Sequence, residues 1–156
     1  MNTTRSDSET TDDVVFLKKA IEQANLSIPV DTAYCVGAVL VKDGKILSQG
    51  YSRELPGNTH AEECCLLKLS NPEEAIDAVM YTTMEPCSLR LSGNKPCCER
   101  LIEAKIKRVV MGVLEPPKFV EDCTGAMELE KNGIQILHLT GFEEQCLQPN
   151  AHVLKQ

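Results

Sequence analysis

Strand-like and helical sequence patterns alternate along most of this chain, and this alternation most constrains the fold. Four segments are predicted to be strands: Lys45–Tyr51, 78–83, Arg108–Val113 and 134–139. Three segments between them are predicted to be helices: 61–69, 97–105 and Gly125–Lys131. When strands and helices alternate, the helices cover the faces of a shared sheet. We therefore predict an α/β fold, a three-layer α/β/α sandwich with a mixed five-stranded sheet.

A further helix and strand precede this alternating part. Apolar residues recur at helical spacing from residue 13 to residue 26, and Pro29 ends the pattern. The apolar segment 34–41 is predicted to form a hairpin with Lys45–Tyr51 through the turn residues Asp43-Gly44. Loops are expected at 53–59 and 85–95, and the tail from Glu143 is left unassigned.

The chain has 156 residues, a length that suits one domain with one core. Residues 1–12 are polar and acidic, so we expect them to be disordered and residues 13–156 to form the folded domain. The N-terminus has no apolar signal core, and no run of about eighteen apolar residues exists. We therefore expect no membrane partner and a cytoplasmic protein, with the nucleus as an alternative.

The charge and the aromatic content disfavour a nucleic-acid partner. The formal net charge is −7, and the chain has three Phe, three Tyr and no Trp. Binding to a phosphate backbone needs a basic surface, and single-strand binding also uses stacking aromatics. A small-molecule substrate is therefore expected. The eight cysteines are expected to be reduced, because the chain has no secretion signal and some of them lie in metal-ligand context.

Three short motifs hold residue types that suit a catalytic zinc site: His60-Ala61-Glu62, Pro86-Cys87 and Pro96-Cys97. A catalytic zinc takes three protein ligands and keeps a fourth position for water or substrate. We expect Zn²⁺ as the cofactor, bound by His60, Cys87 and Cys97. Glu62 is expected to take a proton from the attacking water and to return it to a leaving amine.

The positions of these motifs favour metal binding. His60 and Cys97 both stand at expected helix starts, where unpaired N–H groups and the helix dipole stabilise a thiolate. Pro96 suits such a start because its missing N–H is not needed there. The expected reaction is attack by hydroxide on an amine-bearing carbon of an aromatic heterocycle.

Two alternatives for this site stay open at the level of sequence. The cluster could be a closed structural zinc site with Cys98, Cys64 or Cys65 as a fourth ligand. Cys98 also competes directly with Cys97, although Cys97 is preferred because it follows Pro96.

Several residues around the motifs are candidates for substrate binding. They are Arg53, Glu54, Asn58, Ala61, Arg90 and Lys95, and Arg100 lies near them. The basic residues could hold a phosphate, and Asn58 could bond to a ring or a sugar. The alternative for each is a solvated surface charge or a turn residue without a function.

The chain resembles the cytidine-deaminase superfamily, whose zinc enzymes carry an H-x-E…P-C-x-x-C signature. Nine residues rather than two separate Cys87 from Cys97 here. Within the superfamily, the chain is similar to the pyrimidine deaminases of riboflavin biosynthesis in their fungal form. The resemblance is carried by VGAVLVKDGKILSQGYSRE, GNTHAEECCLL, YTTMEPCSLRLSGNKPCCERL and IKRVVMGVLEPPKFVEDCTGAMELEKNGIQI.

This resemblance implies a cytidine-deaminase-like fold and zinc-dependent deamination of 2,5-diamino-6-ribitylamino-4(3H)-pyrimidinone 5′-phosphate. It implies zinc ligands at His60, Cys87 and Cys97, a proton shuttle at Glu62, and a homodimer. An alternative is another nucleobase or nucleoside deaminase, acting on cytosine, guanine or tRNA adenosine. A second alternative is a non-catalytic zinc-binding partner subunit, which is disfavoured because Glu62 is present.

Overall fold

Five strands form a single sheet in the order β2-β1-β3-β4-β5. A computed structural model gives this structure and describes residues 7–88, 90, 94–116 and 123–154. The strands are β1 (Gly37–Lys42), β2 (Lys45–Tyr51), β3 (Val79–Met84), β4 (Arg108–Val113) and β5 (Gln135–His138). β1 pairs antiparallel with β2 and β3, whereas β3, β4 and β5 are parallel. The prediction of a mixed five-stranded sheet is confirmed.

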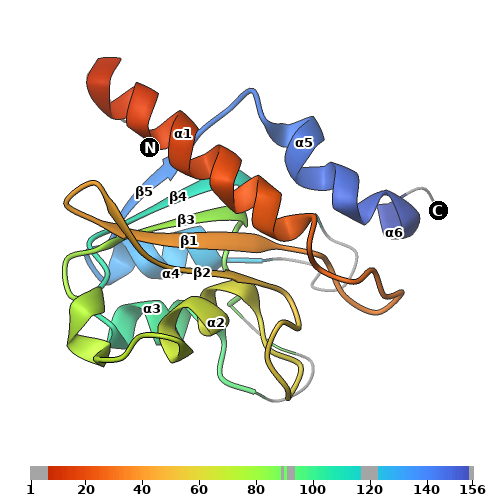
Figure 1. Cartoon of the computed structure of the whole chain (residues 1–156), viewed down its shortest axis with the longest axis horizontal. Helices are drawn as coiled ribbons and strands as arrows, with labels where there is room; N and C mark the ends of the chain where they lie inside the picture. Colours follow the sequence, from red (N-terminus) through yellow and green to blue (C-terminus); the bar gives the residue numbers. More distant parts are fainter. Residues whose placement is uncertain (1–6, 89, 91–93, 117–122, 155–156) are drawn as a thin grey trace.

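Helices cover both faces of this sheet (Figure 1). One face carries α1 (Asp7–Ala24) and α5 (Glu143–Leu147). The other carries α2 (Ala61–Leu67), α3 (Cys97–Glu103) and α4 (Gly125–Lys131). Three short helical segments complete the described chain: η1 (Pro72–Ala75), η2 (Gln148–Asn150) and α6 (Ala151–Leu154). The predicted three-layer α/β/α sandwich is therefore confirmed.

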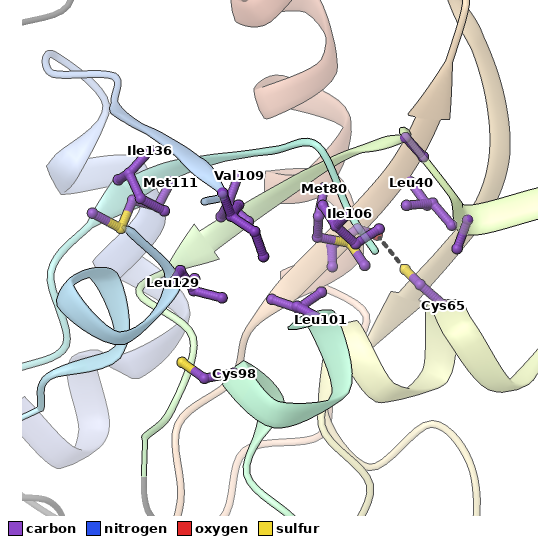
Figure 2. Packing of buried hydrophobic residues seen from close by; sticks show 14 of the residues in the cluster. Leu40, Cys65, Met80, Cys98, Leu101, Ile106, Val109, Met111, Leu129 and Ile136 are labelled. Carbon is purple, nitrogen blue, oxygen red and sulfur yellow. Dashed lines mark hydrogen bonds between the residues drawn. The ribbon is translucent and has the colours of Figure 1, made fainter. Parts of the chain in front are cut away.

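Alternating side chains of the strands build one core on each side of the sheet, because successive residues of a strand point to opposite faces. The core shared with α1 and α5 takes Val39, Tyr81, Val110 and Leu137 from the strands. The core shared with α2, α3 and α4 takes Leu40, Met80, Val109 and Ile136. Figure 2 shows this second core, where Leu101 of α3 and Leu129 of α4 lie among the strand residues.

Two turns follow from residues that accept a positive φ. Asp43 and Gly44 have φ of 52° and 76°, which is the pattern of a type I′ turn, and they connect β1 to β2. Gly133 has a φ of 83° and follows the C-cap Asn132 of α4, where a left-handed residue ends the helix.

Element boundaries differ most from the predictions at the two ends of the chain, whereas α2, α3, β3 and β5 differ by one or two residues at an end. Helix α1 begins at Asp7 rather than at residue 13, so the segment expected to be disordered is helical from Asp7 onward, and residues 1–6 lie outside the described residues. Once a helix is anchored, each added residue gains a backbone hydrogen bond without a new nucleus. The unassigned tail contains α5, η2 and α6, of which Cys146 and Val153 are buried against the sheet.

Strand β1 begins at Gly37, three residues later than predicted. A Cβ atom at Gly37 would collide with the backbone of α1 at Ala20 and Ala24, so the helix lies directly on this strand. No helix in the described part of the chain is long and apolar enough to cross a membrane.

Candidate metal centre and active site

The three predicted metal ligands come from three different elements and meet at one end of β3. His60 is the residue immediately before α2, and Cys97 is the first residue of α3. Cys87 follows β3 after Glu85 and Pro86. Among the residues that the structure describes, His60, Cys87 and Cys97 form a group whose ligand atoms all lie within 4.8 Å of one another.

The distances within this group fit a tetrahedral zinc ion. Nδ1 of His60 lies 3.6 Å from Sγ of Cys87 and 3.3 Å from Sγ of Cys97. With Zn–N near 2.0–2.1 Å and Zn–S near 2.3 Å, tetrahedral geometry separates nitrogen and sulfur by about 3.6 Å. One imidazole and two thiolates also match the softness that zinc prefers. The donor set leaves one position of a tetrahedron for water or substrate.

The thiols of Cys87 and Cys97 interact directly with each other. The hydrogen bond from Cys97 lowers the pKa of the Cys87 thiol to about 4. The same contact, together with burial, raises the pKa of Cys97. The lowered pKa of Cys87 favours its thiolate, which is the form that binds a metal ion.

The other cysteines considered as ligands point away from this group. Sγ of Cys98 lies 3.4 Å from the carbonyl oxygen of Gly125 and is part of the core between sheet and helices (Figure 2). Sγ of Cys65 lies 3.5 Å from the carbonyl oxygen of Ala38, and Sγ of Cys64 lies 3.2 Å from Oγ1 of Thr59. The structure thus brings Cys97 rather than Cys98 to His60.

Glu62 lies beside the group and is 3 % exposed. Its Oε1 is 3.8 Å from Sγ of Cys97, and its Oε2 is 3.1 Å from the hydroxyl of Thr82 on β3. Burial raises the pKa of Glu62, and the nearby His60 opposes this shift. The arrangement places a desolvated carboxylate within reach of a molecule bound at the open position, as general acid/base chemistry requires.

Four of the six substrate-binding candidates have charged side chains with protein partners. Arg53 donates to the carbonyl oxygens of Tyr34 and Ile28, at 3.1 and 3.0 Å. Arg90 donates to the carbonyl oxygen of Asn58 at 2.6 Å. Two ion pairs near the surface account for the other two candidates: Glu54–Lys68 and Lys95–Glu103, each at 2.7 Å. Arg53 and Arg90 bond to backbone carbonyl oxygens, so neither is the solvated surface charge that was the alternative to substrate binding.

The remaining two candidates are close to His60 in the sequence: Asn58 lies two residues before it, and Ala61 follows it directly. Asn58 is exposed and has a φ of 57°, as expected of a turn residue. Ala61 is fully buried and is the first residue of α2, where a backbone N–H has no partner within the helix.

Two residues at this site, Thr82 and Glu63, were not predicted from the sequence. Thr82 touches Glu62, and Glu63 accepts a hydrogen bond from the backbone N–H of His60 at 3.1 Å. Burial raises the pKa of Glu63, but the His60 N–H and Arg90 outweigh it and lower that pKa. A glutamate three residues after a helix N-cap is a capping-box signal, and this signal could have identified Glu63.

Comparison with known proteins places this site in a family. The protein-family model for the cytidine and deoxycytidylate deaminase zinc-binding region matches residues 10–113 of this chain. A Schizosaccharomyces pombe diaminohydroxyphosphoribosylamino-pyrimidine deaminase is 48 % identical over 135 residues, which are 85 % of this chain and 33 % of the relative. The chain thus spans about a third of the length of the first curated relatives it matches.

Solved structures agree with this placement. The Aspergillus oryzae Rib2 deaminase, as a C-terminal deletion mutant, is 36 % identical with a TM-score of 0.78, covering 88 % of this chain and 89 % of that one. The same Rib2 deaminase has been solved in complex with DARIPP and matches with 35 % identity and a TM-score of 0.77. The cytidine-deaminase-like fold expected from the sequence is confirmed. The chain belongs to the family of cytidine and deoxycytidylate deaminases that carry this zinc-binding region.

Proposed function

We propose that the chain is a zinc-dependent hydrolytic deaminase of riboflavin biosynthesis. Its substrate would be 2,5-diamino-6-ribitylamino-4(3H)-pyrimidinone 5′-phosphate, which loses its C2 amine as ammonia. The observation that carries the reaction class is the His60, Cys87 and Cys97 cluster with buried Glu62 beside it. The substrate class is supported by 48 % identity to a fungal pyrimidine deaminase and by likeness to a Rib2 deaminase that binds DARIPP.

His60, Cys87 and Cys97 would hold the zinc ion, through Nδ1 and the two Sγ atoms that face one another. When bound there, zinc would act as a Lewis acid that lowers the pKa of a water molecule, so that hydroxide is available to attack at neutral pH. The closed structural site is disfavoured because Cys64, Cys65 and Cys98 point to other partners.

Glu62 would carry the proton through the reaction. Its carboxylate takes a proton from the attacking water, as the new C–O bond forms at C2. It then gives that proton to the amine nitrogen, so the C–N bond breaks with ammonia as the leaving group. The hydroxyl of Thr82, 3.1 Å from Oε2 of Glu62, would hold the carboxylate in the orientation that allows both transfers.

Substrate contacts are assigned first to Asn58 and Ala61, which flank the metal ligand His60. The Asn58 amide is exposed and suits a hydrogen bond to the ring or the sugar. The backbone N–H of Ala61 is at the start of α2 and suits a hydrogen bond to the carbonyl oxygen or a ring nitrogen of the pyrimidinone. Lys95 and Glu54 take part in solvent-exposed ion pairs that can exchange partners, whereas Arg53 and Arg90 support the backbone.

The rest of the assignment follows the family. We propose that residues 13–156 form the deaminase domain and that the protein is a homodimer. We also propose that it acts in the cytoplasm, on a small phosphorylated pyrimidine rather than on nucleic acid. The net charge of −7 supports the absence of a nucleic-acid partner.

The test is ammonia release by the purified, zinc-loaded protein. The ribitylamino pyrimidine phosphate is compared with its ribosylamino counterpart, and cytidine and guanine serve as controls. Preferential release from the ribityl compound supports the proposal. Release only from cytidine or guanine would overturn the substrate assignment, and no release from any of the four would overturn the enzyme assignment.

A further inference from the structure

A buried charge cluster lies beside the candidate metal centre and is made by Glu63, Arg90 and Arg100. Oε1 of Glu63 is 3.0 Å from Nη1 of Arg90, and Oε2 is 3.0 Å from Nη2 of Arg100. The exposed fractions of the three side chains are 9 %, 2 % and 24 %. One carboxylate is thus shared between two guanidinium groups that are mostly removed from solvent.

This cluster connects the start of α2, helix α3 and the stretch between Cys87 and Cys97, which are the segments around the candidate ligands. Oε1 of Glu63 accepts the backbone N–H of His60 at 3.1 Å, which ties the carboxylate to the first ligand. Arg100 lies in α3, three residues after Cys97. Arg90 belongs to the nine-residue stretch between Cys87 and Cys97, and it donates to the carbonyl oxygens of Asn58 and Lys95, at 2.6 and 3.3 Å.

Glu63 supplies the negative charge that faces the two guanidinium groups of this cluster. Buried charges are costly unless they are paired, and removing one partner leaves an uncompensated charge. The Nε atoms of Arg90 and Arg100 are buried without a hydrogen-bond partner among the described residues. Within that part of the chain, no second carboxylate is paired with either guanidinium.

We propose that Glu63 is a positioning residue for the metal centre. By accepting the His60 N–H and pairing with Arg90 and Arg100, it fixes the start of α2 relative to the start of α3. His60 and Cys97 are thereby held at the spacing that a metal ion needs. The inference rests on the proposed zinc site, and it is independent of which pyrimidine is the substrate.

The expected size of the effect follows from the behaviour of residues that orient metal ligands. Loss of such a partner costs about 10- to 100-fold in metal affinity or activity. A residue that only stabilises the fold would instead lower the unfolding temperature and leave the zinc affinity of the folded protein unchanged.

The test compares Glu63→Gln with Glu99→Gln. Glu99 is the matched control because it occupies the same third position of its helix, α3, and is exposed. Zinc affinity is measured by competition with a chromogenic chelator, at a temperature where circular dichroism shows each variant to be folded. We expect Glu63→Gln to lose about 10- to 100-fold in zinc affinity and Glu99→Gln to stay within about twofold of the original protein.

A second pair of variants covers the case in which Glu63→Gln does not fold. Arg100→Met leaves one carboxylate paired with one guanidinium, so the remaining charges balance. It should lose about 10-fold in zinc affinity, and Arg100→Lys should recover most of that loss.

Unchanged zinc affinity in Glu63→Gln, or in Arg100→Met where only the latter folds, would overturn the positioning role. This failure is distinct from failure of the proposed function. A protein that binds zinc and shows the Glu63 effect, but releases no ammonia from any pyrimidine, would refute the function and leave this inference standing.

Discussion

The backbone N–H of Cys97 donates a hydrogen bond to Sγ of Cys87 across 3.1 Å. A second bond, from the N–H of Cys98 to the carbonyl oxygen of Cys87, runs beside it at 3.1 Å. These bonds close the base of the nine-residue stretch between the two cysteines. These two bonds therefore fix the separation of the two thiols. The stretch between the cysteines can then be longer than the two residues of the C-x-x-C signature and still give the same ligand geometry.

Replacing Glu62 by Gln is expected to abolish turnover and to retain zinc. The amide preserves the shape of the side chain and the contact with Thr82, but it cannot accept and return a proton. The rate of ammonia release should fall by about 10²- to 10⁴-fold, while metal analysis should still find one zinc for each chain. Glu128→Gln, at an exposed position of α4, is the control. Substantial turnover in Glu62→Gln would show that another group moves the proton.

Serine substitutions at Cys97 and Cys98 are expected to give opposite results. Sγ of Cys97 faces His60, so Cys97→Ser should greatly reduce zinc content and activity. Sγ of Cys98 faces the carbonyl oxygen of Gly125, so Cys98→Ser should keep its zinc and lose only stability. Zinc content after dialysis against a weak chelator distinguishes the two, and loss of zinc from Cys98→Ser alone would reverse the ligand assignment.

Asp13 is expected to matter for stability and not for catalysis. It is 1 % exposed, accepts two hydrogen bonds from Arg108 at 2.9 and 3.2 Å, and accepts a third from the Tyr81 hydroxyl at 2.7 Å. Asp13→Asn should lower the free energy of unfolding by about 3 kcal/mol, the low end for a broken buried pair because Arg108 is partly exposed. Urea unfolding measures this, with exposed Asp12→Asn as the neighbouring control. Equal losses in both variants would contradict the prediction.

Alkaline pH is expected to destabilise the fold through Cys146. Burial, with a smaller effect of Glu143, raises the pKa of this thiol to about 12. In the unfolded chain a cysteine ionises near pH 8.5, so above that pH the folded state binds the extra proton. The free energy of unfolding should then fall as the pH rises from about 8.5 toward 12, by at most about 1.4 kcal/mol for each pH unit.

The measurement is the unfolding free energy of the original protein minus that of Cys146→Ala, followed from pH 8 to pH 10.5. The difference should shrink as the pH rises, because the variant has no thiol to protect. Parallel curves for the two proteins would mean that Cys146 ionises as readily in the folded chain as in the unfolded one.

The fold was predictable because hydrophobic period and turn chemistry act locally. The Asp43-Gly44 turn and the bounds of β2, β4 and α4 matched their predictions. The short helices after residue 143 were missed because each has five residues or fewer, too few for a helical period to emerge. Burial of Cys146 and Val153 against the sheet, a tertiary effect, holds them in place.

Only the part of the candidate site that lies within the sequence motifs was predictable. The His-Ala-Glu and Pro-Cys motifs predicted His60, Cys87 and Cys97, which the structure brings together. The partners of the charged residues were not predictable, because Glu63 and Arg90 are 27 residues apart in the sequence. A charge near a motif carries no information about whether it faces solvent or a distant carboxylate.

The arrangement of β3 in the sheet has a consequence for the order of folding. His60 precedes β3, whereas Cys87 and Cys97 follow it, and β3 pairs with β1 on one side and β4 on the other. The β1–β2 hairpin can form early because its pairing is local. The three ligands meet only after β3 has paired with β1, from which it is separated in the sequence by β2, α2 and η1. Metal uptake should thus follow this non-local pairing, and a bound ion should report that β3 has joined the β1–β2 hairpin.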